Sequence, residues 1–218
     1  MRKALRVILF IVFTFLSVLM VRLTLPYFSF DDQTAFLRIK QWVINNSFWK
    51  ACFYTHVITS CFCLVAGFTQ FSIPLLKKYP KVHRYVGILY VLVILIASGP
   101  SGFVMGIYAN GGFTSQAAFV LLSILWWYFT YKAFIHAKRK QFKNHEAFMV
   151  RSFALTLSAL TLRSWKFLIV MFLRPHPMDV YTLVAWLGWV PNLLIAECYI
   201  YAKIQKSHVL SRLWFIKN

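Results

Sequence analysis

The sequence predicts an all-α protein, a polytopic transmembrane bundle of about six helices with both termini in the cytoplasm. Hydrophobic residues make up 60% of the 218 residues, and charged residues make up only 13%. A soluble domain has a charged fraction of about 25%, whereas a chain embedded in hydrocarbon avoids charge because burying it there is costly. Six stretches also reach the length of about 20 mainly apolar residues that a spanning helix needs. They are Leu5–Leu25, Trp49–Phe71, Tyr85–Tyr108, Phe113–Ile135, Ala147–Leu173 and Val180–Ala202.

The first apolar stretch is interpreted as a retained anchor helix and not as a signal peptide. Arg2 and Lys3 precede it, as in a signal peptide, but the residues before Pro26 contain no small-x-small cleavage site. Lys and Arg gather in the loops on one side, which the positive-inside rule assigns to the cytoplasm. We therefore expect a single membrane domain over residues 1–218. Its parts are an anchor helix (1–25), an outer loop (26–48), a five-helix core (49–202) and a basic cytoplasmic tail (203–218).

The net charge of +19 does not predict nucleic-acid binding. Basic residues that bind nucleic acids cluster on a soluble face, whereas these lie in short loops between apolar stretches. On a cytoplasmic surface they favour anionic lipids, by about 1 kcal/mol for each charge near the membrane. The four cysteines are expected to be packing residues because their spacing fits no metal site, so no metal is predicted. They are Cys52, Cys61, Cys63 and Cys198.

Two regions of irregular backbone are expected. In the outer loop, the stretch Phe36–Val43 is either an amphipathic helix at the membrane interface or a simple cap over the bundle. The third span contains Pro100 within Ser98–Gly102, and the sixth contains Pro191. Proline removes a backbone donor and kinks a helix, so neighbouring helices must satisfy the carbonyls that it frees.

Ionisable side chains inside a span are candidates for function by default. Counting about 1.5 Å per residue places His83 and His145 at the cytoplasmic ends of the third and fifth spans. Arg151 lies one to two turns deeper, at a depth similar to that of Glu197 on the sixth span. We expect these two residues to form an intramembrane ion pair, with a role that is either functional or only architectural.

A second polar group is expected nearer the outer face. His56 shares a helical face with Thr59 and Cys63, and it is either a core histidine bonded to a carbonyl or a contact for haem, a metal or a quinone. Lys166 lies nearer the outer surface than Arg163, so its ammonium can snorkel outward. Arg163 therefore needs a partner, which can be a carbonyl, a lipid phosphate or the anionic group of a ligand.

Five short runs occur in an order that resembles one family of bacterial membrane proteins, the domain of unknown function 2306. The runs are Gly67–Phe71, His83–Tyr90, His145–Leu155, Thr161–Arg163 and Trp189–Glu197. The likeness extends from about residue 53 to 202, and it implies a bacterial inner membrane location but no activity. It also implies that a set of polar residues matches positions that recur across the family. These are His56, His83, His145, Arg151 and Arg163.

A weaker resemblance is to helical bundles of the cytochrome b561 and ferric-reductase type. Those proteins clamp a haem between histidines on two helices and often present Arg or Lys to its propionates. The resemblance implies that His83 and His145 form a haem pair with Arg151 near a propionate. The chain departs from this pattern because His56 has no histidine partner at its depth, so a second haem pair is missing.

Three classes of function remain open from the sequence. The first is a membrane redox protein that binds haem b or a quinone. The second is a small transporter or a lipid-binding assembly factor, and the third is a structural membrane subunit with a homo-oligomeric or other membrane partner. No Ser-His-Asp order, zinc-protease motif, paired carboxylate or nucleotide-binding loop is present. The sequence therefore identifies no catalytic residue and leaves open whether the protein is an enzyme.

Overall fold

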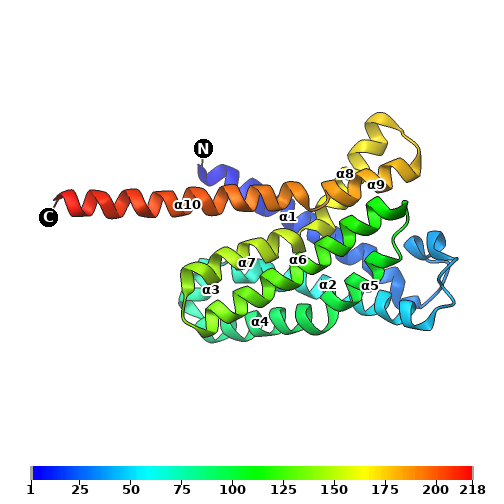
Figure 1. The fold of residues 1–218 in the computed structure, drawn as a ribbon, viewed down its shortest axis with the longest axis horizontal. Coiled ribbons are helices and arrows are strands. Elements are labelled where there is room, and N and C mark those ends of the chain that lie inside the picture. The colour runs from blue at the N-terminus through cyan, green and yellow to red at the C-terminus, as the bar shows by residue number, and fades with distance from the viewer. Residues whose placement is uncertain (1, 218) are drawn as a thin grey trace.

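The computed structural model describes the backbone of residues 2–217 and the side chains of residues 11–12 and 14–203. Within the described backbone every regular element is a helix, so the all-α prediction is confirmed (Figure 1). The elements in chain order are α1 (Arg2–Thr24), η1 (Leu25–Ser29), η2 (Ala35–Lys40), α2 (Ser47–Gln70), α3 (Ile73–Lys78), α4 (Pro80–Val93), η3 (Ile94–Ser98), α5 (Gly99–Ile107), α6 (Gly112–Lys138), α7 (Phe142–Thr156), α8 (Ser158–Leu173), α9 (Pro177–Leu187) and α10 (Val190–Lys217).

Five helical stretches are long and apolar enough to cross a membrane. They correspond to the five predicted spans that follow the outer loop, which are thereby confirmed in length and composition. The first predicted span, Leu5–Leu25, coincides with α1. Some of its side chains lie outside the described residues. Its described part belongs to a shorter apolar helical segment, Thr14–Ser29. The five stretches are Ser47–Gln70, Pro80–Ile107, Gly112–Lys138, Phe142–Leu173 and Pro177–Lys203.

Four helical rods surround the main core. Helix α2 packs against α4 and α5, α5 packs against α6, α6 packs against α7, and α7 returns to α2. Helices α4 and α7 therefore face each other diagonally across the bundle. Between them lies a cluster of buried side chains that fills the centre. It contains Cys63, Ala66, Tyr90, Val91, Ile94, Trp126, Ala133, Met149, Leu155 and Trp189.

The bundle has two distinct ends. We call the end with the turns at residues 71–79 and 139–141 the basic end, and the end with residues 25–46 the cap end. Helix α1 begins and α10 finishes on the side of the basic end, while the α8–α9 hairpin projects beyond the bundle on the side of the cap end (Figure 1). Helix α10 lies along α7, and α1 lies against α2 and α8.

The kink predicted in the third span is a π-helical turn, η3, which ends at Ser98, two residues before Pro100. Because proline lacks an N–H, a carbonyl in the preceding turn loses its partner. The indole Nε1 of Trp127 donates to the main-chain oxygen of Leu95 at 2.9 Å. A neighbouring helix thus satisfies the freed group, as the lipid environment requires.

The last two spans are also broken, at Leu157 between α7 and α8 and at Gly188 between α9 and α10. The two breaks support each other. Asn192 Nδ2, from α10, donates to the main-chain oxygen of Ala154 at 3.1 Å. Thr161 Oγ1, from α8, donates to the main-chain oxygen of Gly188 at 2.5 Å. Polar side chains therefore supply the donors that each interrupted helix lacks.

Residues 25–46 form a cap that packs onto the bundle, so of the two interpretations of this loop the capping one is observed. Leu37 and Val43 are buried against Trp49 and Phe53 of α2. Lys40 is buried with them at only 1% exposure. Its ammonium donates to the main-chain oxygen of Tyr108 and to Asn110 Oδ1, which ties the cap to the α5–α6 turn.

Because the ammonium group of Lys40 is buried, the free energy of unfolding is expected to change with pH in the alkaline range. Desolvation lowers the pKa of Lys40 from 10.5 to about 8, because burial disfavours the charged form. Between these values the unfolded chain binds more protons than the folded one, so the free energy of unfolding rises with pH. We expect a rise of roughly 3 kcal/mol across this window, absent in Lys40→Met. Equilibrium unfolding in detergent at pH 7.5 and 10.5 measures it, and parallel pH profiles for the two proteins would contradict the assignment.

Candidate functional site

His145 is held in one orientation at the basic end. Helix α7 begins at Phe142, so His145 lies in its first turn, where its Nδ1 is 2.9 Å from the main-chain oxygen of Ala133 on α6. A carbonyl oxygen only accepts hydrogen bonds, so Nδ1 carries the proton and Nε2 keeps its lone pair. No described residue forms a hydrogen bond with Nε2. Ligating histidines are commonly arranged in this way, with one nitrogen anchored and the other free.

His83 lies near His145, on the diagonally opposite helix. It lies in the first turn of α4, and the two imidazoles are close enough for their charges to interact. The Nδ1 atom of His83 is buried and has no hydrogen-bond partner among the described residues. Buried polar atoms of this kind are rare in folded proteins and call for an explanation.

Gln70 borders the same region from α2. Gly87 lies one turn after His83 on α4, and a Cβ atom added to it would stand 2.7 Å from Gln70 Oε1. The glutamine amide therefore lies directly over this glycine. The structure thus brings Gln70, His83 and His145 to the basic end of the bundle, and we call these three residues the histidine site.

A buried hydroxyl network closes the bundle beneath the histidine site. Tyr90 follows His83 by seven residues, a rise of about 10 Å along the helix. Its hydroxyl lies 3.0 Å from Ser152 Oγ and 2.8 Å from Thr156 Oγ1, both on α7. Trp126 and Thr130 of α6 bond to the same two side chains at 3.0 and 2.7 Å. This network, which sequence reasoning missed, joins the diagonal helices directly.

Arg151 and Glu197 form the ion pair that their depths predict. Arg151 donates from Nε to Oε1 at 2.5 Å and from Nη2 to Oε2 at 2.8 Å, which makes the contact bidentate. The guanidinium also faces the Phe148 and Phe129 rings at 5.1 and 5.9 Å. Because its charge is already balanced, the geometry favours the architectural role, in which Arg151 holds α10 against α7.

His56 lies in a separate cluster around the π-helical turn. Its Nδ1 is 2.9 Å from the main-chain oxygen of Ser98, and its Nε2 is 3.3 Å from Ser60 Oγ. The ring packs over Gly102, where an added Cβ would stand 2.8 Å from the ring. Ser98 Oγ in turn donates to Thr59 at 2.7 Å. Both ring nitrogens are engaged inside the protein, which favours the core-histidine interpretation.

Arg163 lies on α8, apart from the histidine site. Its Nη1 donates to the main-chain oxygen of Ala159 at 2.8 Å. It is close enough to His56 and Cys61 of α2 for electrostatic interaction. No acidic side chain forms an ion pair with it in the described part of the chain. Its charge is therefore not balanced within the protein.

The ligand set at the histidine site limits what it can hold. Among the described residues, no three His, Cys, Asp or Glu side chains gather as metal ligands, and all four cysteines are free. Two imidazoles alone do not complete the shell of a simple protein-bound zinc ion, which takes at least three protein ligands. A group that brings ligands of its own, such as a porphyrin, needs only two.

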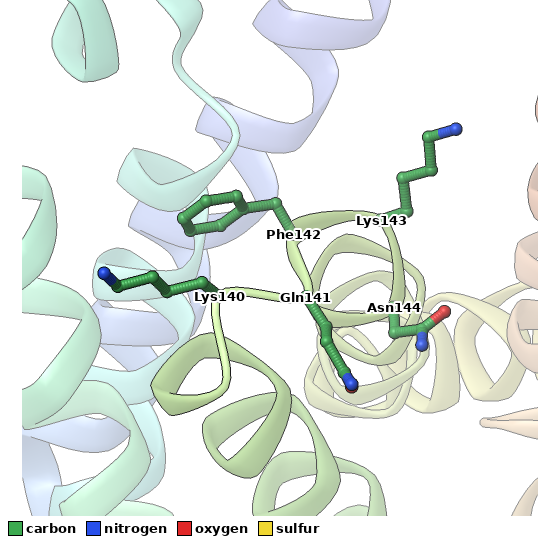
Figure 2. Close-up of a pocket in the computed structure, with 5 residues that line it drawn as sticks. All are labelled: Lys140, Gln141, Phe142, Lys143 and Asn144. Carbon is green, nitrogen blue, oxygen red and sulfur yellow. The ribbon is translucent and has the colours of Figure 1, made fainter.

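The surface beside His145 is basic and hollowed. Residues 140–144 line a hollow of about 560 Å³. Figure 2 shows Lys140 and Phe142 extending to one side of the turn and Lys143 extending away from them. Phe142 is 68% exposed. Lys140 has a φ of 58° at the end of α6, a left-handed position that glycine usually occupies. Exposed aromatic and basic residues together are typical of a membrane interface.

The fold and the site define a polytopic membrane protein, a diagonal bundle of spanning helices with polar groups at two depths. The family model described as a predicted membrane protein (DUF2306) matches residues 53–200. This match covers most of the chain, and the chain belongs to that family, as the order of its motifs predicted. No curated protein and no solved structure matches the chain, so the weaker resemblance to cytochrome b561 bundles is not confirmed.

Proposed function

We propose that this membrane protein is a redox protein that holds haem b between His83 and His145. The observation that carries this proposal is the placement of the two imidazoles on diagonal helices at one end of the bundle. Cofactor sites of helical bundles are commonly built from side chains on such facing helices. The lone pair of His145 Nε2 and the unpartnered, buried Nδ1 of His83 support it.

The surrounding residues suit this role. The Ala133 carbonyl fixes the His145 ring, so the ring does not need to reorganise on binding a ligand. Below the site, the Tyr90 network links α4 to α7 through buried hydroxyl groups. Haem b would supply one-electron oxidation and reduction at the basic end. A quinone is the alternative within the same class, because its carbonyl oxygens accept hydrogen bonds from imidazole N–H groups.

The transport alternative has less support. Carriers use broken helices to present free backbone groups to a substrate. Here Asn192 and Thr161 occupy carbonyls at the two breaks. The breaks therefore stabilise the bundle and offer these carbonyls to no ligand, which favours a redox protein over a small transporter.

An absorption spectrum of the purified protein tests the haem proposal. After expression with a haem precursor, we expect a Soret band that shifts on reduction with dithionite. Either His83→Ala or His145→Ala should abolish the reduced-state shift or reduce haem content at least tenfold. His136→Ala is the matched control, because that ring is only partly buried, bonds to Gln141 and stacks on Phe148. A spectrum without a Soret band, or a band unchanged in both alanine variants, would overturn the proposal.

We further propose that the membrane is a bacterial inner membrane and that the basic end lies in the cytoplasm. The concentration of Lys and Arg at this end supports the orientation. The same charges make anionic phospholipids the expected partners of the turn at residues 140–144. Phe142 would enter the interface there while Lys140 and Lys143 meet lipid phosphates.

A further inference from the structure

Arg163 lacks an acidic counter-charge. The protein has only five acidic residues, and three of them form ion pairs with Lys50, Arg151 and Lys203. The other two lie in the cap and in the first turn of α9, outside the middle of the spans. They are Asp31 and Asp179. None of these five acidic side chains, all within the described part of the chain, is therefore placed to neutralise Arg163.

The guanidinium points along α8, away from the cap end. Arg163 precedes the end of α8 by ten residues, which is about 15 Å of helix. Its Nη1 donates to the carbonyl of Ala159, one turn further from the cap end. The side chain therefore does not snorkel toward the cap end, as long basic side chains near an interface do. A charge at such a depth costs roughly 3 kcal/mol unless it finds a partner.

The side chain lies at a junction of three helices. It lies near Tyr27, which follows α1, and near Cys61 of α2, and α1 packs against both α2 and α8. Cys61 also contacts α1, because its Sγ is 3.0 Å from Thr24 Oγ1. Arg163 is thus placed where α1, α2 and α8 meet and where a molecule dissolved in the membrane can approach from the side.

The surface around Arg163 combines two cations with an apolar wall. A groove of about 380 Å³ runs along α8, and we call it the Arg163 groove. Within it Phe167 and Met171 are 67% and 56% exposed. Its lining residues are Arg163, Lys166, Phe167, Val170 and Met171.

We propose that the Arg163 groove binds an anionic phospholipid, with its phosphate group on Arg163 and Lys166. The planar guanidinium presents several N–H donors and suits two-point contact with a phosphate. The hydrocarbon part of the ligand packs against Phe167, Val170 and Met171. This proposal concerns the half of the membrane nearer the cap end, and it is independent of whether haem occupies the histidine site.

Native mass spectrometry of the purified protein tests the groove. The probes are phosphatidylglycerol, oleate and, as the control without net charge, phosphatidylcholine, whose phosphate is balanced by its own choline group. We expect one equivalent of phosphatidylglycerol to stay bound at a concentration at least tenfold below that needed for phosphatidylcholine. Retention of phosphatidylglycerol alone supports the proposal, whereas retention of oleate alone would show that the ligand is a free carboxylate and would overturn it.

Variants locate the bound probe. Arg163→Gln should raise the concentration needed for binding at least tenfold, whereas Arg174→Gln, which removes the same charge beyond the end of α8, should leave it unchanged. If Arg163→Gln fails to fold, Arg163→Lys keeps a cation but not the fork, and it should weaken binding by a smaller factor. Equal binding of the neutral and anionic lipids, or equal loss in the variants at residues 163 and 174, would overturn the proposal.

Discussion

Glu197→Gln is expected to destabilise the protein by about 3 kcal/mol, because removing one partner of an ion pair leaves the other charge uncompensated. Arg151 lies within a span and donates to Glu197 through two nitrogens. A glutamine amide retains one acceptor but cannot balance the charge. Neither water nor salt screens that charge within the hydrocarbon as it would at a surface. Equilibrium unfolding in detergent by increasing SDS measures the loss.

The same two helices offer a matched control. Glu146 of α7 pairs with Lys203 of α10 near the basic end, and there the lysine is 52% exposed, whereas the Arg151 side chain is only 20% exposed. Exposed ion pairs contribute little, so Glu146→Gln should cost less than about 1 kcal/mol. Combining Glu197→Gln with Arg151→Met should recover most of the stability, because it removes the stranded charge as well. Similar losses for the two glutamate variants would show that Arg151 does not depend on its partner.

Depth along a span could be predicted from the sequence because it requires only a count of residues. The similar depths of Arg151 and Glu197 indicated their pairing, and those of His83 and His145 indicated that the two imidazoles lie at the same end. The boundaries of five spans follow from the length of hydrocarbon that each must cross.

Rotation about the helix axis could not be predicted in the same way. In a soluble helix the polar face marks the outside, whereas in a membrane both lipid and protein interior are apolar. The sequence therefore did not reveal that Tyr90 faces Ser152 and Thr156 across the bundle. Tyr90 follows His83 by seven residues, and Ser152 follows His145 by seven. Thr156 follows Ser152 by four residues. These spacings were the only available signal.

The cap shows a second limit of sequence reasoning. Lys40 lies in the segment predicted as the outer loop, where a lysine is normally solvated. Its burial depends on acceptors supplied by Tyr108 and Asn110, about seventy residues later in the chain. Only the folded arrangement brings those acceptors to it. The reciprocal support of the two broken spans by Thr161 and Asn192 depends on long-range contacts in the same way.

Gly67→Ala is expected to destabilise the protein by about 2 kcal/mol, because an added methyl group has no space at this position. Gly67 is buried on α2, and its Cβ would stand 2.4 Å from the Phe153 ring and 3.4 Å from the Tyr90 ring. The Phe153 ring cannot easily withdraw, because Phe68 and Phe71 contact it with ring centroids at 5.3 and 4.9 Å. The clash should outweigh the gain of about 1 kcal/mol in helix propensity that alanine brings.

Gly87→Ala separates this clash from a general effect of replacing a helical glycine. Its only close neighbour is the end of the flexible Gln70 side chain, which can rotate away at little cost. We therefore expect Gly87→Ala to change the free energy of unfolding by less than about 1 kcal/mol, while Phe153→Leu should partly rescue Gly67→Ala by shortening the obstructing ring. Equal effects of the two glycine variants in SDS unfolding would mean that α2 and α7 can separate without cost. In that case the close packing of Gly67 against Phe153 would not contribute to the stability of the bundle beneath the histidine site.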